Sequence, residues 1–201
     1  MSLKFQYNKT ALQALNKQLN IRLRALPTLK NKESALRMEV KIAKAETKKL
    51  AADLEEVIHG QDKNLRMWNE FDSGLVSVKE VKLGFRKIAG EKIPQLDEVV
   101  FDTKEFDVFA EPKWFLDGIE VLKELFRLVI EKDIAERKME MLEYARKKTT
   151  QKVNLYEKVQ IPEYEDAIQK IKRYLEDEEN LAKAAQKIVK KRQQNAEEAA
   201  L

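Results

Sequence analysis

Few residues in this 201-residue chain could carry chemistry. It has one histidine, His59, and no cysteine, so it lacks the ligands for a histidine-based metal site or a zinc-binding cysteine set. None of its five scattered glycines precedes a Lys-Ser or Lys-Thr pair, which argues against a phosphate-binding loop. Carboxylates are plentiful, but the Glu-Asp-Glu-Glu run at 176–179 is most simply an exposed acidic patch. We therefore expect a non-catalytic protein that uses no metal and no cofactor.

The composition favours long, solvated helices. Charged residues make up 37% of the chain and aromatic residues 7%, with only 5 glycines and 4 prolines. The lack of cysteine indicates a reducing compartment, no apolar run reaches the length of a membrane span, and the first residues lack the apolar core of a signal peptide. The expected location is cytoplasmic, without direct membrane insertion.

The charge is distributed unevenly along the chain. Residues 1–50 hold twelve Lys or Arg against three Glu, whereas residues 91–124 hold ten acidic residues against four Lys. This asymmetry suggests different partners for different parts of the chain, although solvated surface explains it equally well.

A heptad pattern organises the first part of the chain and predicts one coiled-coil helix over residues 3–70. Eleven of the fourteen a and d positions between Leu12 and Val57 are apolar. Pro27 lies beside this seam and predicts a kink, because the heptad continues in phase across it. The polar seam residues Arg22, Glu33 and Thr47 either fix the register or face a third body, and Arg22 could also reach past the seam to solvent. The seam includes Leu12, Leu15, Leu19, Leu26, Leu36, Val40, Leu50 and Leu54.

The rest of the chain supplies a turn and a second long helix. Alternating apolar residues from Val76, with turn signals at Gly90 and Pro94, predict a β-hairpin within a compact section at 72–112. Residues 113–195 then read as a helix interrupted by Pro162, and its own seam includes Ile161, Ile168, Ile171 and Leu175. The predicted fold is mainly α: the two helices form one antiparallel coiled coil within a monomer, and the first seam pairs with residues 144–189.

Three stretches resemble the D subunits of the V-type (vacuolar or archaeal-type) ATPase family. Residues 151–168, QKVNLYEKVQIPEYEDAI, resemble the family block R-V-N-A-L-E-x-V-x-I-P-x-L-E-x-T-I, and residues 29–36, LKNKESAL, resemble its LLK-x-K-x-x-x-L signature. The spacing of Ile88, Gly90, Ile93 and Pro94 is similar to the family's central segment. Residues 151 and 152 are Gln and Lys where two arginines are usual, and the family's glycine near position 25 is absent, which suggests a divergent bacterial member.

The resemblance implies the central rotor shaft of a proton- or sodium-translocating rotary ATPase, peripheral to the inner or plasma membrane. It implies that the paired terminal helices enter the hexamer of catalytic A and B subunits. It also implies that the middle of the chain binds the F subunit and the funnel-shaped subunit (C or d) above the membrane ring. We expect the hexamer contact to use Arg22, Arg24, Lys30, Lys32, Lys190, Lys191 and Arg192, and the contact with the base and the F subunit to use Trp114, Phe115, Leu122 and Phe126.

Two other functions are compatible with a basic coiled coil. Electrostatic nucleic-acid binding would show a steep salt dependence, but the chain has no recognisable DNA-reading module, and no nucleic-acid partner is expected. A chaperone-like scaffold would form a stable homo-oligomer, whereas a rotor shaft should be a monomer in isolation.

Overall fold

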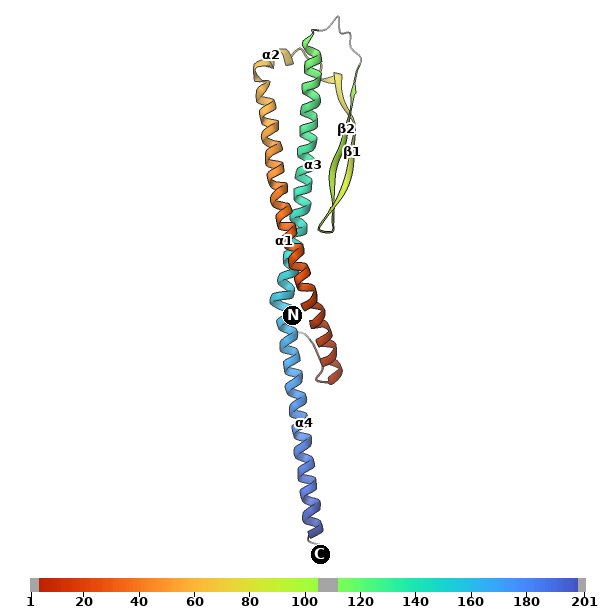
Figure 1. Ribbon diagram of the computed structural model, residues 1–201, viewed down its shortest axis with the longest axis vertical. Coiled ribbons are helices and arrows are strands. Elements are labelled where there is room, and N and C mark those ends of the chain that lie inside the picture. The colour runs from red at the N-terminus through yellow and green to blue at the C-terminus, as the bar shows by residue number, and fades with distance from the viewer. Residues whose placement is uncertain (1–3, 105–111, 199–201) are drawn as a thin grey trace. The chain divides into compact units, whose positions relative to one another are not determined.

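The computed structural model describes residues 4–104 and 112–198, which form long helices and one β-hairpin (Figure 1). The expected fold class, long N- and C-terminal helices with a hairpin between them, is confirmed. The chain divides into two compact units. The first unit combines the chain up to Asn31 with the chain from Thr150 onward, and the second unit is Lys32–Thr149. In order, the elements are α1 (Lys9–Gly60), η1 (Asp62–Asn64), α2 (Leu65–Trp68), η2 (Ser73–Leu75), β1 (Val76–Ile88), β2 (Glu91–Thr103), α3 (Trp114–Asn154), η3 (Leu155–Gln160) and α4 (Ile161–Glu198).

Helix α1 begins at a side-chain cap and runs through its proline. The Asn8 side-chain oxygen accepts a hydrogen bond from the backbone N–H of Ala11 at 2.7 Å, which satisfies one of the donors that a helix start leaves unpaired. Pro27 lies inside α1 without ending it, so the helix has no break there. Whether Pro27 kinks the helix stays a prediction.

The structure ends the first helix earlier than the heptad pattern suggests. The pattern places one helix over 3–70, of which residue 3 lies outside the described residues, whereas α1 ends at Gly60. Glycine is a poor helix former, and the hydrogen bonds that follow it reach only to the third preceding residue. Gln61 N–H donates to Ile58 O at 3.0 Å, and Asn64 N–H donates to Gln61 O at 2.8 Å. Trp68 therefore belongs to the short helix α2 and does not continue the seam of α1.

The middle section contains the expected hairpin, with its turn at Ala89 and Gly90. Both residues have positive φ values, 49° and 85°, as the favoured two-residue hairpin turn requires. Pro94 is not part of the turn: it lies in β2 opposite Phe85, where a two-stranded sheet leaves an edge that needs no donor. Residues 105–111 of the predicted 72–112 section lie outside the described residues.

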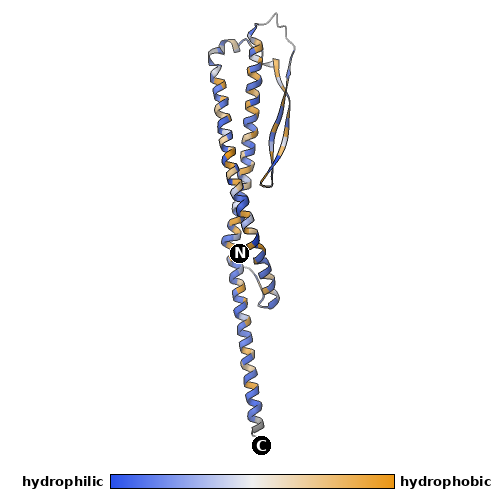
Figure 2. Ribbon diagram, in the orientation of Figure 1, coloured by the Kyte–Doolittle hydropathy of each residue, from blue (hydrophilic) through white to orange (hydrophobic). Residues whose placement is uncertain are grey.

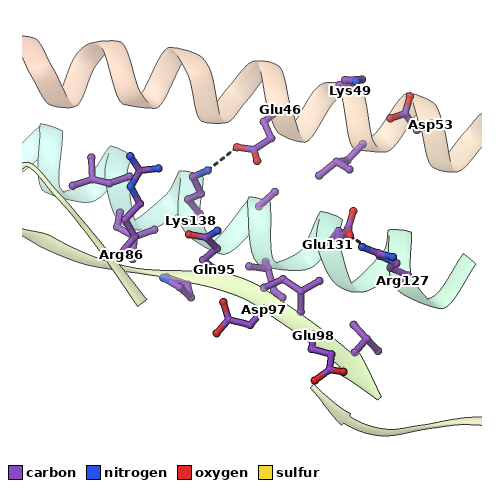
Figure 3. A pocket seen from close by; sticks show the side chains of 18 of the residues that line it. Glu46, Lys49, Asp53, Arg86, Gln95, Asp97, Glu98, Arg127, Glu131 and Lys138 are labelled. Atoms are coloured by element: carbon purple, nitrogen blue, oxygen red, sulfur yellow. Dashed lines mark hydrogen bonds and ion pairs between the residues drawn. The ribbon is translucent and has the colours of Figure 1, made fainter. Parts of the chain in front are cut away.

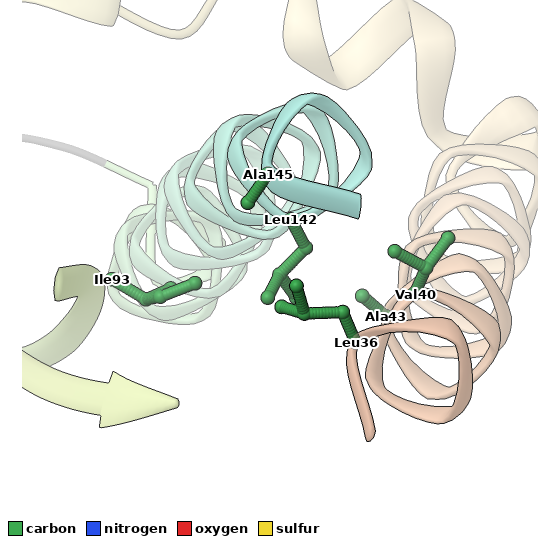
Figure 4. Packing of buried hydrophobic residues seen from close by; sticks show 6 residues of the cluster. All are labelled: Leu36, Val40, Ala43, Ile93, Leu142 and Ala145. Carbon is green, nitrogen blue, oxygen red and sulfur yellow. The ribbon is translucent and has the colours of Figure 1, made fainter. Parts of the chain in front are cut away.

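The core of the second unit joins α1, α3 and the hairpin. Leu36 from α1 and Leu142 from α3 are both 0% exposed, and Ile93 from β2 is 1% exposed. Figure 4 shows the side chains of Leu36 and Leu142 pointing toward each other, with Val40 and Ala43 along the same face of α1. The seam residues Leu36 and Val40 thus pack in a cluster that includes the hairpin residue Ile93, which a simple two-helix seam does not provide.

The core of the first unit is a seam between α1 and α4. Leu15 packs with Ile168 and Ile171, and the cluster is widened by partly buried residues that include Leu12, Leu19 and Leu175. Phe5 and Tyr7, which precede α1, add ring contacts: Tyr7 lies 4.9 Å from Tyr174 between ring centroids. Every α4 side chain from residue 176 to residue 195 is exposed, so the cover of α4 ends at Leu175.

A wide turn divides the second predicted helix. The pattern places one helix over 113–195 with an interruption at Pro162, and the structure has α3, the π-helical turn η3 and then α4. The backbone N–H of Ile161 donates to Tyr156 O, a bond to the fifth preceding residue. Pro162 follows at once and has no N–H to donate, so the widened turn lies where regular helix bonding already fails.

Candidate functional site

The described residues hold no cluster of metal-ligating side chains. No group of three or more His, Cys, Asp or Glu within residues 4–104 and 112–198 could hold a metal ion. His59 is exposed, with Nδ1 3.2 Å from an Asp62 carboxylate oxygen. None of the helices in the same residues is both long and apolar enough to cross a membrane. The described residues also present charged side chains, exposed apolar side chains and a cleft.

Arg22 is engaged inside the first unit and is not a free cation. Its Nε donates to Gln160 Oε1 at 2.7 Å, and its Nη1 donates to the backbone and side-chain oxygens of Gln18, each at 2.9 Å. The guanidinium carbon lies 4.4 Å from the ring centroid of Tyr164, within the range of a cation–π contact. Arg22 therefore occupies its seam position by pairing with α4 and η3, rather than by reaching past the seam.

Of the three other basic residues expected at the hexamer contact on α1, two form ion pairs with described residues and one does not. Lys30 pairs with Glu157 at 2.6 Å in the first unit, and Lys32 pairs with Glu91 at 3.0 Å in the second unit. Arg24 is exposed and makes no hydrogen bond or ion pair within the described parts of the chain. Of the expected hexamer-contacting residues on α1, Arg24 alone therefore offers a charge that no side chain in residues 4–104 or 112–198 neutralises.

The other polar seam residues also have local partners. A Glu33 carboxylate oxygen lies 2.8 Å from the Arg37 guanidinium one helical turn later. The Thr47 hydroxyl donates to the backbone oxygen of Ala43 at 2.9 Å, a local bond that satisfies a half-buried hydroxyl.

The end of α4 presents a basic and partly apolar surface. Leu181 is 72% exposed, and Ile188, one heptad later on the same face, is 55% exposed. Lys190, Lys191 and Arg192 follow, are exposed and have no ionic partner among the residues described. Figure 2 shows this part of α4 as a mainly hydrophilic helix with separate hydrophobic residues. Nothing within residues 4–104 and 112–198 covers these side chains.

The aromatic residues expected at an interface form an internal cluster of the second unit. Phe115 is 4% exposed and lies 5.0 Å from the ring of Phe71 and 4.7 Å from that of Trp114. Leu122 and Phe126 are partly buried against the same cluster. The absence of a side chain at Gly118 leaves room for the Phe71 ring, because a Cβ there would lie 2.9 Å from a Phe71 ring carbon. These residues hold the start of α3 to the segment before β1.

A cleft of about 640 Å³ lies within the second unit, lined by α1, the hairpin and α3 (Figure 3). Its lining contains two ion pairs: Lys138 contacts Glu46 at 2.7 Å, and Arg127 contacts Glu131 at 3.0 Å. The lining contains no Ser, Thr, Cys, His or Tyr, so it offers no side-chain nucleophile of those types. The heptad and strand patterns gave no sign of this cleft, since it depends on where the hairpin lies against the two helices.

Comparisons with known proteins give one consistent result. The sequence model of the family described as the ATP synthase D subunit matches residues 11–191. A V-type ATP synthase D subunit of Borreliella burgdorferi is 32% identical over 193 residues, covering 93% of this chain and 94% of the relative. The D subunit of the Chlamydia muridarum V-type ATP synthase is 27% identical, covering 98% of this chain and all of the relative. That of Thermotoga neapolitana is 25% identical over 83% of this chain and 87% of the relative.

Proposed function

The chain belongs to the family of ATP synthase D subunits, and we propose that it is the central-stalk rotor shaft of a V-type ATPase. In this role it is a non-catalytic component that transmits torque between the hexamer of A and B subunits, where ATP is hydrolysed or made, and the ion-translocating membrane ring. The observation that carries the proposal is the extent of the match: residues 11–191 include all of the hairpin and α3, nearly all of α1 and most of α4.

The structure supports a mechanical role through its bonding pattern. Long helices close their own backbone hydrogen bonds, and in this chain buried seam residues from α1 pack with α4 in the first unit and with α3 in the second.

We assign the hexamer contact to the exposed residues of the first unit. Lys190, Lys191 and Arg192, with Arg24, offer charge that the described chain leaves unpaired, and Leu181 and Ile188 add uncovered apolar area. Acidic or carbonyl-rich loops of the A and B subunits are the matching chemistry. Arg22 and Lys30 contribute to this contact chiefly by fixing the helices, because their own charges are paired within the chain. Lys32 lies at the start of the second unit, and its pair with Glu91 joins α1 to the hairpin.

We assign the base of the shaft to the second unit, with the F subunit and the funnel-shaped subunit as its partners. The aromatic cluster around Trp114 and Phe115 supports this region from inside. The hairpin residues Leu83 and Phe85, which are 45% and 61% exposed, provide contact area for these partners.

The test is co-expression of the chain with the A, B and F subunits of the same organism. The chain is expected to co-purify in a complex that elutes as one species, and alone it is expected to be a monomer. Assembly of an active hexamer that excludes the chain, under conditions where the chain is folded, would refute the proposal. A stable homo-oligomer of the isolated chain would instead favour a scaffold.

A further inference from the structure

Across η3, the spacing between buried residues is one residue longer than a whole number of heptads. Val153, at the end of α3, and Ile161, at the start of α4, are both buried and are eight residues apart. Ile168 is buried fifteen residues after Val153, where two heptads would be fourteen. In a regular α-helix, one additional residue turns the following face by about 100°. An uninterrupted helix that kept the heptad repeat would therefore turn Ile161 and Ile168 by about 100° away from the seam that contains Val153.

The first unit offers one long element that can cover all three. Ile168 packs in one cluster with Leu15 of α1, and Val153 and Ile161 are buried residues of the same unit, whose described residues are 4–31 and 150–198. The extra residue must be absorbed between Val153 and Ile161. The only departure from α-helical bonding in that interval is η3.

The hydrogen bonding of η3 absorbs one residue. Ile161 N–H donates to Tyr156 O, so this turn holds one residue more than an α-helical turn, whose bonds reach the fourth preceding residue. With one residue taken up, the step from Val153 to Ile161 becomes a heptad. The same subtraction brings Ile168 into phase with Val153.

The alternative phase would place charge in the seam. Without the widened turn, the positions of Tyr164 and Ile171 would pass to the preceding residues, Glu163 and Lys170. Lys170 is exposed and pairs with Asp166 at 2.7 Å, and the hydrogen bond from its ammonium to that carboxylate raises the pKa of Lys170. If Lys170 moved into an apolar seam, its ammonium group would lose both the ion pair with Asp166 and its contact with water.

Helix α1 contacts the turn with two cations. Arg22 donates to Gln160, the last residue of η3, and stacks on Tyr164, one turn into α4. Lys30 pairs with Glu157, inside η3, at 2.6 Å. Both contacts join α1 to the stretch where the helix phase changes.

From these observations we propose that η3 is a built-in phase correction. It takes up one surplus residue so that the apolar face of α4 meets α1, and Arg22 is the positioning residue that holds the turn in place. The inference does not depend on the proposed function, since it concerns only how the first unit is assembled.

Matched deletions of single residues in the full-length chain test the proposal. Deleting Val159, which is 41% exposed, removes the surplus residue and should leave the melting temperature nearly unchanged, with Ile161 N–H now bonded to the fourth preceding residue. Deleting Gln169, which is exposed and lies outside η3, should turn Ile171 and Leu175 away from α1 and lower the melting temperature by on the order of 10 °C. Equal losses from the two deletions, or a larger loss from the Val159 deletion, would overturn the proposal.

Pro162→Ala separates phase correction from a proline effect. If the seam requires η3, this variant keeps the bond from Ile161 N–H to Tyr156 O, seen in a crystal structure or by hydrogen-bond couplings in solution. If the proline ring alone causes η3, the variant relaxes to a regular helix with an unchanged or raised melting temperature, and the proposal fails.

Arg22 is tested by local hydrogen exchange. Arg22→Lys keeps a charge but loses the planar fork, and it should speed amide exchange at Ile161 by about tenfold or more while leaving α4 amides beyond Leu175 unchanged. A uniform change along α4, or none at Ile161, would contradict the positioning role.

Discussion

Arg22 and Gln160 are joined by a 2.7 Å hydrogen bond between residues 138 positions apart in the sequence. Arg22 stands at a seam position of α1, where a heptad calls for an apolar residue, and its guanidinium also stacks on Tyr164. The bond and the stacking make Arg22 part of the packing between α1 and α4. Replacing Arg22 should therefore lower the stability of the isolated chain, without any partner present.

Arg22→Ala should destabilise the chain by about 1–3 kcal/mol, because it removes a charge-assisted hydrogen bond and a cation–π contact. Urea unfolding followed by circular dichroism measures the loss. Arg24→Ala is the matched control: Arg24 is exposed on the same helix, and its removal should change stability by less than about 0.5 kcal/mol. Equal effects of the two variants would show that the Arg22 contacts contribute nothing.

Gly118→Ala should destabilise the second unit, because the new Cβ would lie 2.9 Å from a Phe71 ring carbon in a packed aromatic cluster. Overpacking of this kind costs about 1–3 kcal/mol. The near-ultraviolet circular dichroism of Trp68 and Trp114 should change as well, since both rings belong to that cluster. Gly60→Ala is the control: its Cβ would meet nothing within 4 Å, so stability should stay equal or rise by about 0.5–1 kcal/mol.

Leu36→Ala should be the more severe of two substitutions made two residues apart on α1. Leu36 is 0% exposed against Leu142, and truncating a buried leucine costs about 2–5 kcal/mol. Met38 is 59% exposed, so Met38→Ala should cost less than about 0.5 kcal/mol. Thermal unfolding of both variants decides the point, and a Met38 effect as large as that of Leu36 would mean that Met38 is covered in the folded chain.

Pro27→Ala should stabilise α1. Pro27 is inside the helix and supplies no N–H, and a proline in a helix interior costs about 3 kcal/mol relative to alanine. A rise in melting temperature is therefore expected. An unchanged or lower melting temperature would show that the helix is already adapted to Pro27, for example by a bend that other contacts need.

The sequence predicts best those features that depend on local periodicity. Leu15 and Ile168 lie in one buried cluster because their residue types and heptad spacing require apolar cover. The hairpin is equally local, since alternating apolar residues and the Gly90 turn specify it. For the same reason the end of α1 is less predictable: Trp68 continues the heptad count, but its ring packs against Phe71 and Trp114.

Features that depend on long-range pairing could not be predicted. Phe115 is an apolar residue near a proline, and only the fold shows that its ring is buried against Phe71. From the sequence alone Arg22 would be taken for an unpaired cation, because its hydrogen bond to Gln160 depends on the fold. The eight-residue step from Val153 to Ile161 is present in the sequence, but it becomes informative only when both residues are known to be buried.

Charge reversal at the end of α4 should impair assembly without affecting folding. Lys190, Lys191 and Arg192 are exposed and lie beyond Leu175, the last residue of α4 that is covered in the first unit. Replacing all three by Glu should leave the melting temperature of the isolated chain unchanged and weaken its binding to the hexamer of A and B subunits by about tenfold or more. Because such steering depends on ionic strength, the defect should shrink in high salt.

A triple reversal on the hairpin, at exposed Lys79, Lys82 and Lys87, is the control that should spare hexamer binding. Equal weakening by both triple variants would indicate a general charge effect and not a contact at the end of α4.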